Sequence, residues 1–237
     1  MREACIVSAR ALRLAGETIQ PGVTTAEIDN VVRTYIEEQG AIPSFLGYNG
    51  FPKSVCVSVN EVVIHGIPDE YMLREGDIVS VDVGAYLNGY HGDNAATFAV
   101  GKISVEAQAL LDATSESLQE GITQAVVGNR VGDIGAAVER YVTLRGYSVV
   151  RQFVGHGVGA KLHEDPSIPN YGTPGRGARL MPGMTLAIEP MINTGTHEVE
   201  VLKDGWTVVT KDRKLSAHFE HTVAITSGGP MILTLPD

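Results

Sequence analysis

Two aspartates, Asp82 and Asp93, lie within an otherwise apolar stretch that reads as a buried β-hairpin over residues 78–100. A carboxylate in a water-poor interior is costly unless a nearby charge compensates it. A cation is therefore implied, and three further residues downstream have side chains suited to holding it. These residue types predict a metal-dependent enzyme.

The turn between the two aspartates fixes their relative placement. Asn88-Gly89 is a strong signal for a two-residue type I′ hairpin turn. With that loop, Gly84 pairs with Asp93, and Asp82 becomes the diagonal neighbour of Asp93 at roughly 5–8 Å between Cβ atoms. The opposite face of the hairpin carries the apolar Val79, Val81, Val83, Ala96, Phe98 and Val100. We therefore expect both carboxylates on one face, close enough to share one or two metal ions.

The second half of the chain repeats the first. Residues 73–82 align without gaps to residues 180–189, matching a leucine, a turn glycine, an apolar strand and a terminal acid. Helices are predicted at about 2–18, 24–40, 104–120 and 133–145, and strands near 55–59, 78–84, 93–100, 148–154, 184–189, 198–202, 206–210 and 218–226. The sequence predicts one α+β domain over residues 1–237, with half 1 at about 1–102, half 2 at about 103–237 and the active centre where they meet.

Glu189 and Glu220 supply the acids of the second half. Strand alternation places Glu189 on the face of Ala187, and Glu220 on the face of His218 and Thr222. Exposure on a half-buried strand is the alternative explanation for any one acid alone. Four acids inside apolar strands related by a repeat favour a metal-binding cluster.

Three of the seven histidines lie where they suit a crowded site. His156 is in the glycine-rich segment 155–159, His163 directly precedes Glu164, and His65 is followed by Gly66. A lone histidine is more often a structural donor than a ligand, so each needs support from its surroundings. The other four are expected in turns, at the surface or behind the ligands: His91, His197, His218 and His221.

The composition narrows the class of protein. The 237 residues are 43% hydrophobic with a formal charge of −10, which provides a substantial core and argues against a nucleic-acid-binding face. Two cysteines, Cys5 and Cys56, exclude a disulfide framework and favour reduced thiols. No signal peptide or membrane-spanning run is found. We expect a cytoplasmic protein that reads neither nucleic acid nor membranes.

Several motifs together resemble the type I methionine aminopeptidases of the pita-bread fold over essentially the whole chain. The motifs lie at residues 47–56, 58–68, 91–93, 155–159, 188–191, 203–206 and 220–222. The resemblance implies two pseudo-symmetric halves with an antiparallel sheet covered by helices. It also implies removal of the initiator methionine from nascent proteins and peptides whose second residue is small.

The resemblance further implies a dinuclear centre. Two divalent ions (Co, Mn, Fe or Zn) are expected, with a bridging hydroxide that attacks the scissile carbonyl. In this reading the metal ligands are Asp82, Asp93, His156, Glu189 and Glu220. His163 would hydrogen-bond to the developing oxyanion or peptide, His65 would contact the scissile amide, and Glu189 would double as a proton shuttle.

Substrate contacts follow from the same resemblance. An apolar pocket for an unbranched thioether is implied around Tyr48, Phe51, Cys56, His65 and Trp206, with His163 also against the substrate. Ordinary core packing is the alternative for Phe51 and Trp206, and a small buried hydrophobe for Cys56. The chain departs from many bacterial members at Asn49, Phe51 and Leu162, which bears on side-chain preference. Nascent polypeptide N-termini are the implied partners, docking on the ribosome stays open, and we expect a monomer.

Two alternatives remain. Aminopeptidases and dipeptidases for Xaa-Pro bonds use a similar ligand set but generally carry an additional N-terminal domain, for which this chain has no room. A non-catalytic pita-bread binding protein would typically have lost metal ligands, whereas all five positions are filled here.

Overall fold

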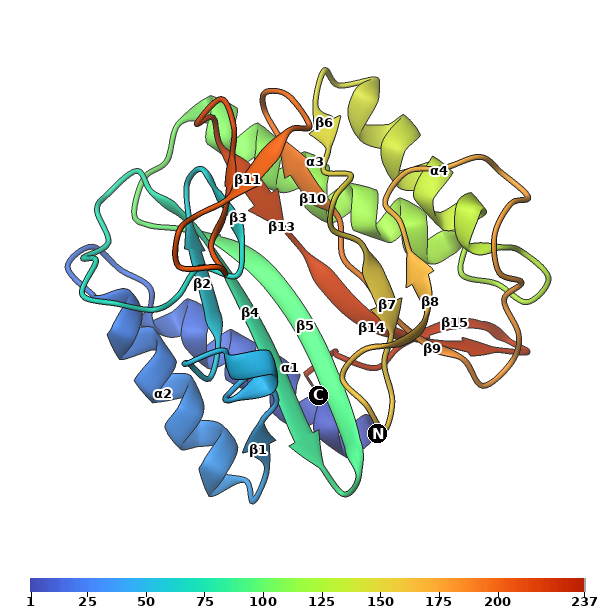
Figure 1. Cartoon of the computed structure of the whole chain (residues 1–237), viewed down its shortest axis with the longest axis horizontal. Helices are drawn as coiled ribbons and strands as arrows, with labels where there is room; N and C mark the ends of the chain where they lie inside the picture. The colour runs from blue at the N-terminus through green and yellow to red at the C-terminus, as the bar shows by residue number, and fades with distance from the viewer. Residues whose placement is uncertain (237) are drawn as a thin grey trace.

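A long antiparallel sheet forms the centre of the molecule (Figure 1). The computed structural model describes residues 1–236, and the last residue of the predicted domain, 237, lies outside the described residues. Within the described residues this sheet has nine strands. Seven of them follow one another in the order β1 (Ile42–Pro43), β4 (Ile78–Leu87), β5 (Tyr90–Ala99), β14 (Glu220–Thr226), β9 (Thr185–Ile188), β7 (Gly155–Gly157) and β8 (Glu164–Ile168). In addition, β2 (Cys56–Val59) pairs with β4, and β15 (Gly229–Ile232) pairs with β14.

Two smaller sheets adjoin the central one. The first contains β13 (Ser216–His218), β10 (Met191–Asn193) and β6 (Ser148–Val149). The second contains β11 (Val199–Val201), β12 (Val208–Thr210) and β3 (Val62–Ile64). The chain passes from the central sheet to the first small sheet between β9 and β10, at Glu189-Pro190, and returns between β13 and β14, at Phe219. Both crossings therefore lie beside predicted site residues.

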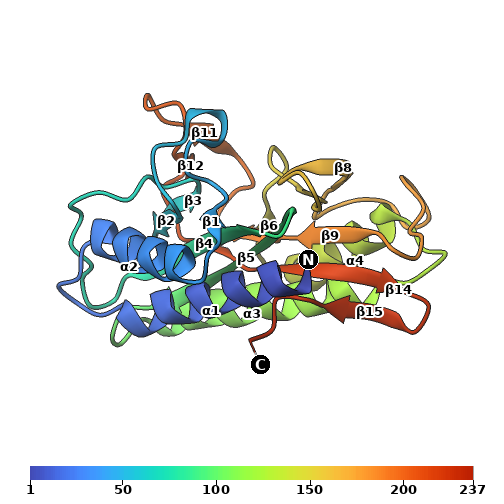
Figure 2. The same ribbon diagram turned by 90° about the horizontal axis from the view of Figure 1, so that it is seen from below.

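Helices cover one side of the central sheet. Helices α1 (Arg2–Thr18) and α3 (Val105–Thr123) lie below the sheet in Figure 2, while β3, β11, β12 and β8 rise on the other side. Helix α2 (Thr25–Glu38) packs along α1, and α4 (Val131–Thr143) packs along α3. A capping box begins α2, in which the backbone N–H of Glu27 donates to Thr24 Oγ1 and that of Thr24 donates to Glu27 Oε2. The side of the sheet away from α1 and α3 is left for the site.

The predicted hairpin is confirmed residue by residue. Leu87 pairs with Tyr90 and Gly84 with Asp93, while positive φ angles of 52° and 85° at Asn88 and Gly89 make the turn. The apolar face packs into a core with α1 and α2, and that core contains Val79, Val81, Val83, Ala96, Phe98 and Val100. The opposite face, with the aspartates, is therefore turned away from the helices.

The repeated segments adopt matching conformations. Leu73 and Leu180 are both buried, and the turn glycines Gly76 and Gly183 have φ angles of 98° and 90°. Strands β4 and β9 begin two residues after these glycines. The division of the chain into two halves as a domain organisation stays a prediction.

The single strand predicted at 148–154 is wrong. The chain forms β6 at 148–149 and β7 at 155–157, and between them it crosses from a small sheet to the central one. Likewise the strand predicted at 218–226 begins only at Glu220, because the chain changes sheets at Phe219. Two- to five-residue strands elsewhere carry too short a pattern to be predicted, as in β1, β8, β10 and β15.

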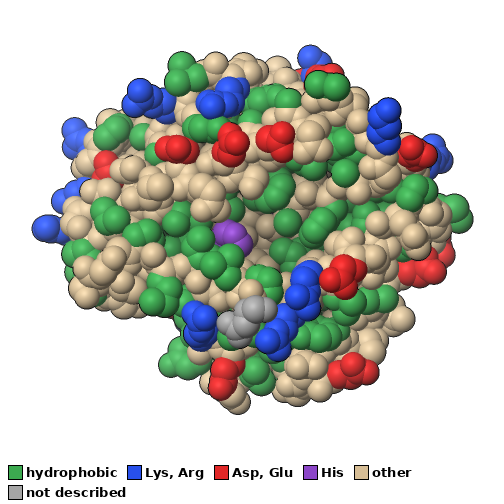
Figure 3. All heavy atoms as spheres, turned by 180° about the vertical axis from the view of Figure 1, so that it is seen from behind, with side chains coloured by type: hydrophobic (Ala, Val, Ile, Leu, Met, Phe, Trp, Pro, Cys, Tyr) green, Lys and Arg blue, Asp and Glu red, His purple; other side chains and the backbone are tan. Residues whose placement is uncertain are grey.

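No described helix combines the length and the apolar character needed to cross a bilayer. On the face seen in Figure 3, Lys and Arg side chains are interspersed with Asp and Glu. They do not gather there into one basic surface.

Candidate active site

Strand pairing gathers the predicted ligands on the open face of the central sheet. Asp82 on β4 pairs with Ala95 on β5, and Ala95 pairs in turn with Glu220 on β14. Ile188 on β9 pairs with His221 on β14, so Glu189 follows directly at the end of β9. This register places Asp82, Glu220 and Glu189 in one row across the central sheet.

A second row runs parallel to the first. Thr222 Oγ1 on β14 donates to the backbone oxygen of Asp93 at 2.7 Å, which joins β5 to β14. Thr222 pairs with Ala187 on β9, and Ala187 pairs with His156 on β7. Asp93 and His156 therefore lie on the same face, separated by small side chains that leave space between them.

The side chains converge closely enough to hold a metal ion. Asp93, His156 and Glu220 each offer one donor atom, and these atoms all lie within 4.8 Å of one another. His156 Nε2 lies 3.4 Å from Glu189 Oε1 and 3.9 Å from Asp93 Oδ2. The Oδ1 atoms of Asp82 and Asp93 are buried without a hydrogen-bond partner. Orphaned carboxylate oxygens beside an imidazole are the donor set that a divalent cation satisfies.

The electrostatics of the cluster also call for a cation. Burial raises the pKa of Asp82 to about 7. It also raises the pKa of Asp93, Glu189 and Glu220 well above the usual range, with the charges of neighbouring carboxylates adding to the effect. Among the described residues that line the cavity there is no Lys or Arg. No positively charged side chain of the described cavity lining therefore balances the negative charge of the four carboxylates. They need divalent cations to stay ionised.

The raised pKa of Asp82 predicts that the contribution of this group to the stability of the metal-free protein falls as the pH rises. The pKa of Asp82 rises from 3.8 when unfolded to about 7 when folded, so between these values only the folded protein holds the proton. Each pH unit in that window lowers the free energy of unfolding by about 1.4 kcal/mol for this group. Buried histidines with a lowered pKa, such as His65, contribute with the opposite sign below about pH 6.5, so chelated wild type is compared with chelated Asp82→Asn. Urea unfolding of the two forms at pH 5, 6 and 7 should show this loss in wild type relative to the variant. The same pH slope in both forms would contradict the prediction.

Close backbone approach places His156 in the cluster. A Cβ at Gly155 would lie 2.3 Å from the Ala187 oxygen, and one at Gly157 would lie 2.4 Å from the Asp165 oxygen. Only glycine therefore lets β7 fit between β9 and β8. Nδ1 of His156 lies 2.8 Å from the Gly157 oxygen, and with the proton on Nδ1 this bond leaves the Nε2 lone pair facing the carboxylates.

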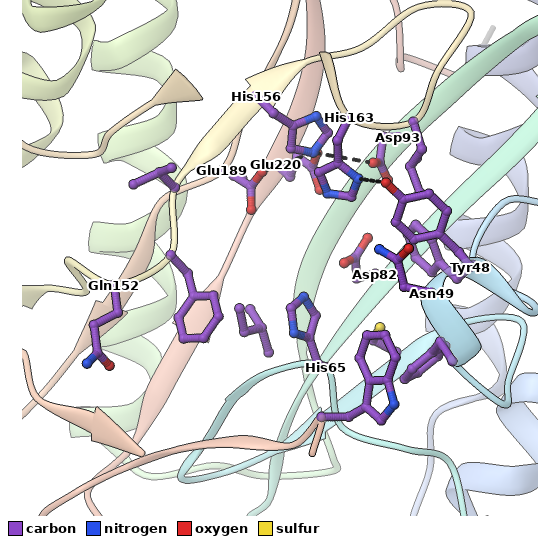
Figure 4. Close-up of a pocket in the computed structure, with 18 residues that line it drawn as sticks. Tyr48, Asn49, His65, Asp82, Asp93, Gln152, His156, His163, Glu189 and Glu220 are labelled. Carbon is purple, nitrogen blue, oxygen red and sulfur yellow. Dashed lines mark hydrogen bonds and ion pairs between the residues drawn. The ribbon is translucent and has the colours of Figure 1, made fainter. Parts of the chain in front are cut away.

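A cavity of about 400 Å³ opens beside the cluster. In Figure 4 the acids and His156 point toward one end, and His65 lies toward the other. Phe51 and Trp206 meet edge to face with ring centroids 5.1 Å apart. Cys56 on β2 pairs with Asp82, which places its side chain between the apolar lining and the acids. The cavity thus joins an apolar end to a metal-binding end.

His163 and Tyr48 form a wall next to the ligands. His163 Nδ1 lies 2.9 Å from the Tyr48 hydroxyl, and the two rings stack with centroids 5.3 Å apart. The ring of His163 also lies 4.0 Å from that of His156. Burial lowers the pKa of His163, which favours a neutral imidazole. Its Nδ1 is engaged by Tyr48, so Nε2 is the atom left to act in the cavity.

His65 lies at a strained backbone position. Its φ is 57°, which is uncommon for a residue other than glycine, and a Cβ at the following Gly66 would lie 2.2 Å from the Val57 oxygen. Burial, with a contribution from the charge of His163, lowers the pKa of His65 to about 4. A neutral imidazole is thus held at the cavity wall, next to the rings of Phe153 and Trp206.

Every residue predicted for the site lines this one cavity. Sequence reasoning did not identify several other lining residues, namely Phe45, Ile64, Gln152, Phe153 and Val154. Asn49 and Leu162, noted only as departures from a family pattern, line it as well. Residues 152–154 directly precede the glycine-rich segment around His156, and this proximity was the available sequence signal that they line the cavity. His218 was expected in a turn, at the surface or behind the ligands, and it is buried behind Glu189.

Comparison with known proteins agrees with this geometry. The model of metallopeptidase family M24 matches residues 1–227. A methionine aminopeptidase of Clostridium perfringens is 55% identical over 235 residues, which cover 99% of this chain and 94% of the relative. The crystal structure of methionine aminopeptidase from Rickettsia prowazekii superposes with a TM-score of 0.97 at 42% identity, covering 99% of this chain and 95% of that one.

The same comparisons separate the alternatives. An Xaa-Pro dipeptidase from Bacillus anthracis shares the fold with a TM-score of 0.79, but at 24% identity, and this chain covers 59% of it. The longer, distant relative is thus a likeness of fold, whereas the methionine aminopeptidases match over nearly their full length. A buried Asp/His/Glu cluster suited to a divalent metal completes the agreement. The chain belongs to metallopeptidase family M24, among its methionine aminopeptidases.

Proposed function

We propose that this enzyme removes the initiator methionine from nascent polypeptides and peptides whose second residue is small, using two divalent metal ions. The observation that carries the proposal is the cavity in which an apolar pocket adjoins the buried acids and His156. The proposed ligands are Asp82, Asp93, His156, Glu189 and Glu220. When bound, two divalent ions lower the pKa of a shared water and so supply hydroxide at neutral pH.

His163 and His65 are proposed to handle the peptide itself. Nε2 of His163 is free to donate a hydrogen bond to the oxygen on which negative charge develops, since Tyr48 engages Nδ1. His65 faces the cavity from the opposite wall and is proposed to contact the scissile amide. Glu189, beside His156, is proposed to carry the proton toward the leaving amine.

The apolar end of the cavity is proposed to hold the methionine side chain. Phe51 and Cys56 are part of one buried apolar cluster, and Tyr48 and Trp206 pack against it. An unbranched thioether adapts to such a surface and makes favourable contacts with aromatic rings. Phe51 and Leu162 are apolar, so recognition relies on shape and dispersion rather than on a hydrogen bond at these positions.

The cellular setting is part of the proposal. Both cysteines are buried and unpaired, as expected for a reducing compartment. We propose cytoplasmic action on nascent N-termini. The monomeric state and docking on the ribosome stay predictions.

A comparison of three peptides tests the proposed function. Met-Ala-Ser should be cleaved faster than Met-Leu-Ser by about 100-fold or more, because the rings of Tyr48, His163 and His156 form a wall beside the ligands that a bulky second side chain is expected to meet. Ala-Pro-Ser should be cleaved as poorly. Values of kcat/KM from released amino acid decide the matter, and equal rates for all three would refute the specificity.

A further inference from the structure

His218, the last residue of β13, is buried directly behind the ligand cluster. Its side chain is 2% exposed, and its Nε2 has no hydrogen-bond partner. That atom lies 3.9 Å from Oε2 of Glu189, while Oε1 of the same carboxylate lies 3.4 Å from His156 Nε2. Glu189 therefore stands between two imidazoles, with one oxygen toward each.

The backbone around His218 is held on both sides. His218 pairs with Met191 across β13 and β10, two residues beyond Glu189. Thr97 Oγ1 accepts a hydrogen bond from the His218 N–H and donates one to the His218 oxygen, both at 2.9 Å. The imidazole is thus anchored, whereas the terminal torsion of a glutamate side chain is broad. Rotation about that torsion changes the 3.9 Å distance from Oε2 to His218 Nε2 without moving the backbone.

An unpartnered ring nitrogen at this depth is unfavourable. A buried donor without a partner loses the hydrogen bonds it makes to water in the unfolded chain, and the Glu189 carboxylate lies 3.9 Å away as an acceptor. A neutral imidazole carries a single N–H, on either Nδ1 or Nε2, and the other ring nitrogen can only accept. A hydrogen bond to an ionised carboxylate is stronger than one between neutral groups.

We propose that His218 donates its Nε2–H to Oε2 of Glu189 and so presents Oε1 to the metal side of the centre, beside His156. This inference rests on the proposed ligand role of Glu189. His218 touches neither metal nor substrate and is a positioning residue. Partners of this kind orient ligating groups, and their loss typically costs about 10- to 100-fold in metal affinity.

The tautomer of His218 in the Zn²⁺-loaded wild type, in which Glu189 is ionised, gives the first test. Long-range ¹H–¹⁵N spectra of the histidine-labelled enzyme, with the His218 signal assigned from its absence in His218→Gln, report which ring nitrogen holds the proton. The proposal requires the proton on Nε2. A proton on Nδ1 would point a lone pair at the carboxylate and overturn it.

Metal binding by two variants gives the second test. Co²⁺ is titrated into metal-stripped wild type, His218→Leu and His218→Gln, and both the affinity and the visible absorption of bound Co²⁺ are recorded. His218→Leu keeps the volume but loses the donor, so Co²⁺ should bind about 10- to 100-fold more weakly and with an altered spectrum. His218→Gln has an amide N–H with similar reach and should stay close to wild type.

His221→Leu is the matched control, because this half-buried histidine faces the other side of the strand, where Nδ1 lies 2.9 Å from Thr234 Oγ1. It should keep the wild-type affinity for Co²⁺. Equal affinity and spectra in wild type and His218→Leu, or an equal loss in both His218 variants, would overturn the proposed hydrogen bond. Failure of the wild type to bind Co²⁺ would instead overturn the metal centre itself. If His218→Leu does not fold, the tautomer decides.

Discussion

Exhaustive removal of divalent metal should abolish peptide hydrolysis, and adding Mn²⁺ or Co²⁺ should restore it. Asp82, Asp93, Glu189 and Glu220 are buried together, and no Lys or Arg lines the cavity among the described residues. The proposed nucleophile is hydroxide from metal-bound water, so removing the metal removes the nucleophile. Removing the metal should therefore abolish catalysis, which is a larger effect than that expected from any single substitution.

The measurement is hydrolysis of Met-Ala-Ser by chelated and dialysed enzyme, before and after stoichiometric metal is returned. Mg²⁺ at the same concentration serves as a comparison, since it prefers oxygen ligands and retains its waters. Activity that persists after complete metal removal would eliminate the proposed mechanism. Recovery that saturates at two ions per chain would support the dinuclear form over a single ion.

Replacing His163 by Ala should lower kcat by about 100- to 1,000-fold while metal binding survives. His163 is proposed to stabilise the charge that develops on the substrate oxygen, and its Nδ1 is already engaged by the Tyr48 hydroxyl at 2.9 Å. The ring lies against that of His156 at a tilt, with centroids 4.0 Å apart, but His163 is not among the proposed ligands. Loss of the ring therefore removes a donor and leaves the donor atoms of the centre in place.

Steady-state kinetics and metal content together test this assignment. Tyr48→Phe is the companion variant, because it keeps the aromatic wall and removes only the hydroxyl that orients His163. Its kcat should fall between those of wild type and His163→Ala. Stoichiometric loss of metal from His163→Ala would mean that the residue is a ligand and that its role is misassigned.

Local rules explain why much of the site was predictable. The type I′ turn at Asn88-Gly89 and the two-residue alternation of strands fix the faces of Asp82 and Asp93 without any knowledge of the rest of the molecule. The repeat then identifies Glu189 by its match to Asp82, and the structure gives both turn glycines a positive φ. Strand periodicity and turn chemistry are thus sufficient to predict most of the residues on the metal-binding face.

Other parts of the site depend on contacts that no local pattern encodes. Phe153 and Val154 reach the cavity because the chain crosses between two sheets there, which ended the strand predicted at 148–154 early. His218 shares the face of Glu220 by strand alternation, but its approach to Glu189 depends on the pairing of β13 with β10. Such long-range pairings are set by tertiary packing rather than by sequence period.

The rows of acids across β4, β5, β14 and β9 have a consequence for folding kinetics. Their members are drawn from residues 82 to 220, so the ligand set has a high contact order and assembles only when distant strands have paired. The β4–β5 hairpin can form early through its local turn, yet alone it offers only two of the acids. Tight metal uptake during refolding should therefore coincide with the last, slowest pairing events rather than with initial collapse. Metal binding would then report that the distant strands of the central sheet have paired.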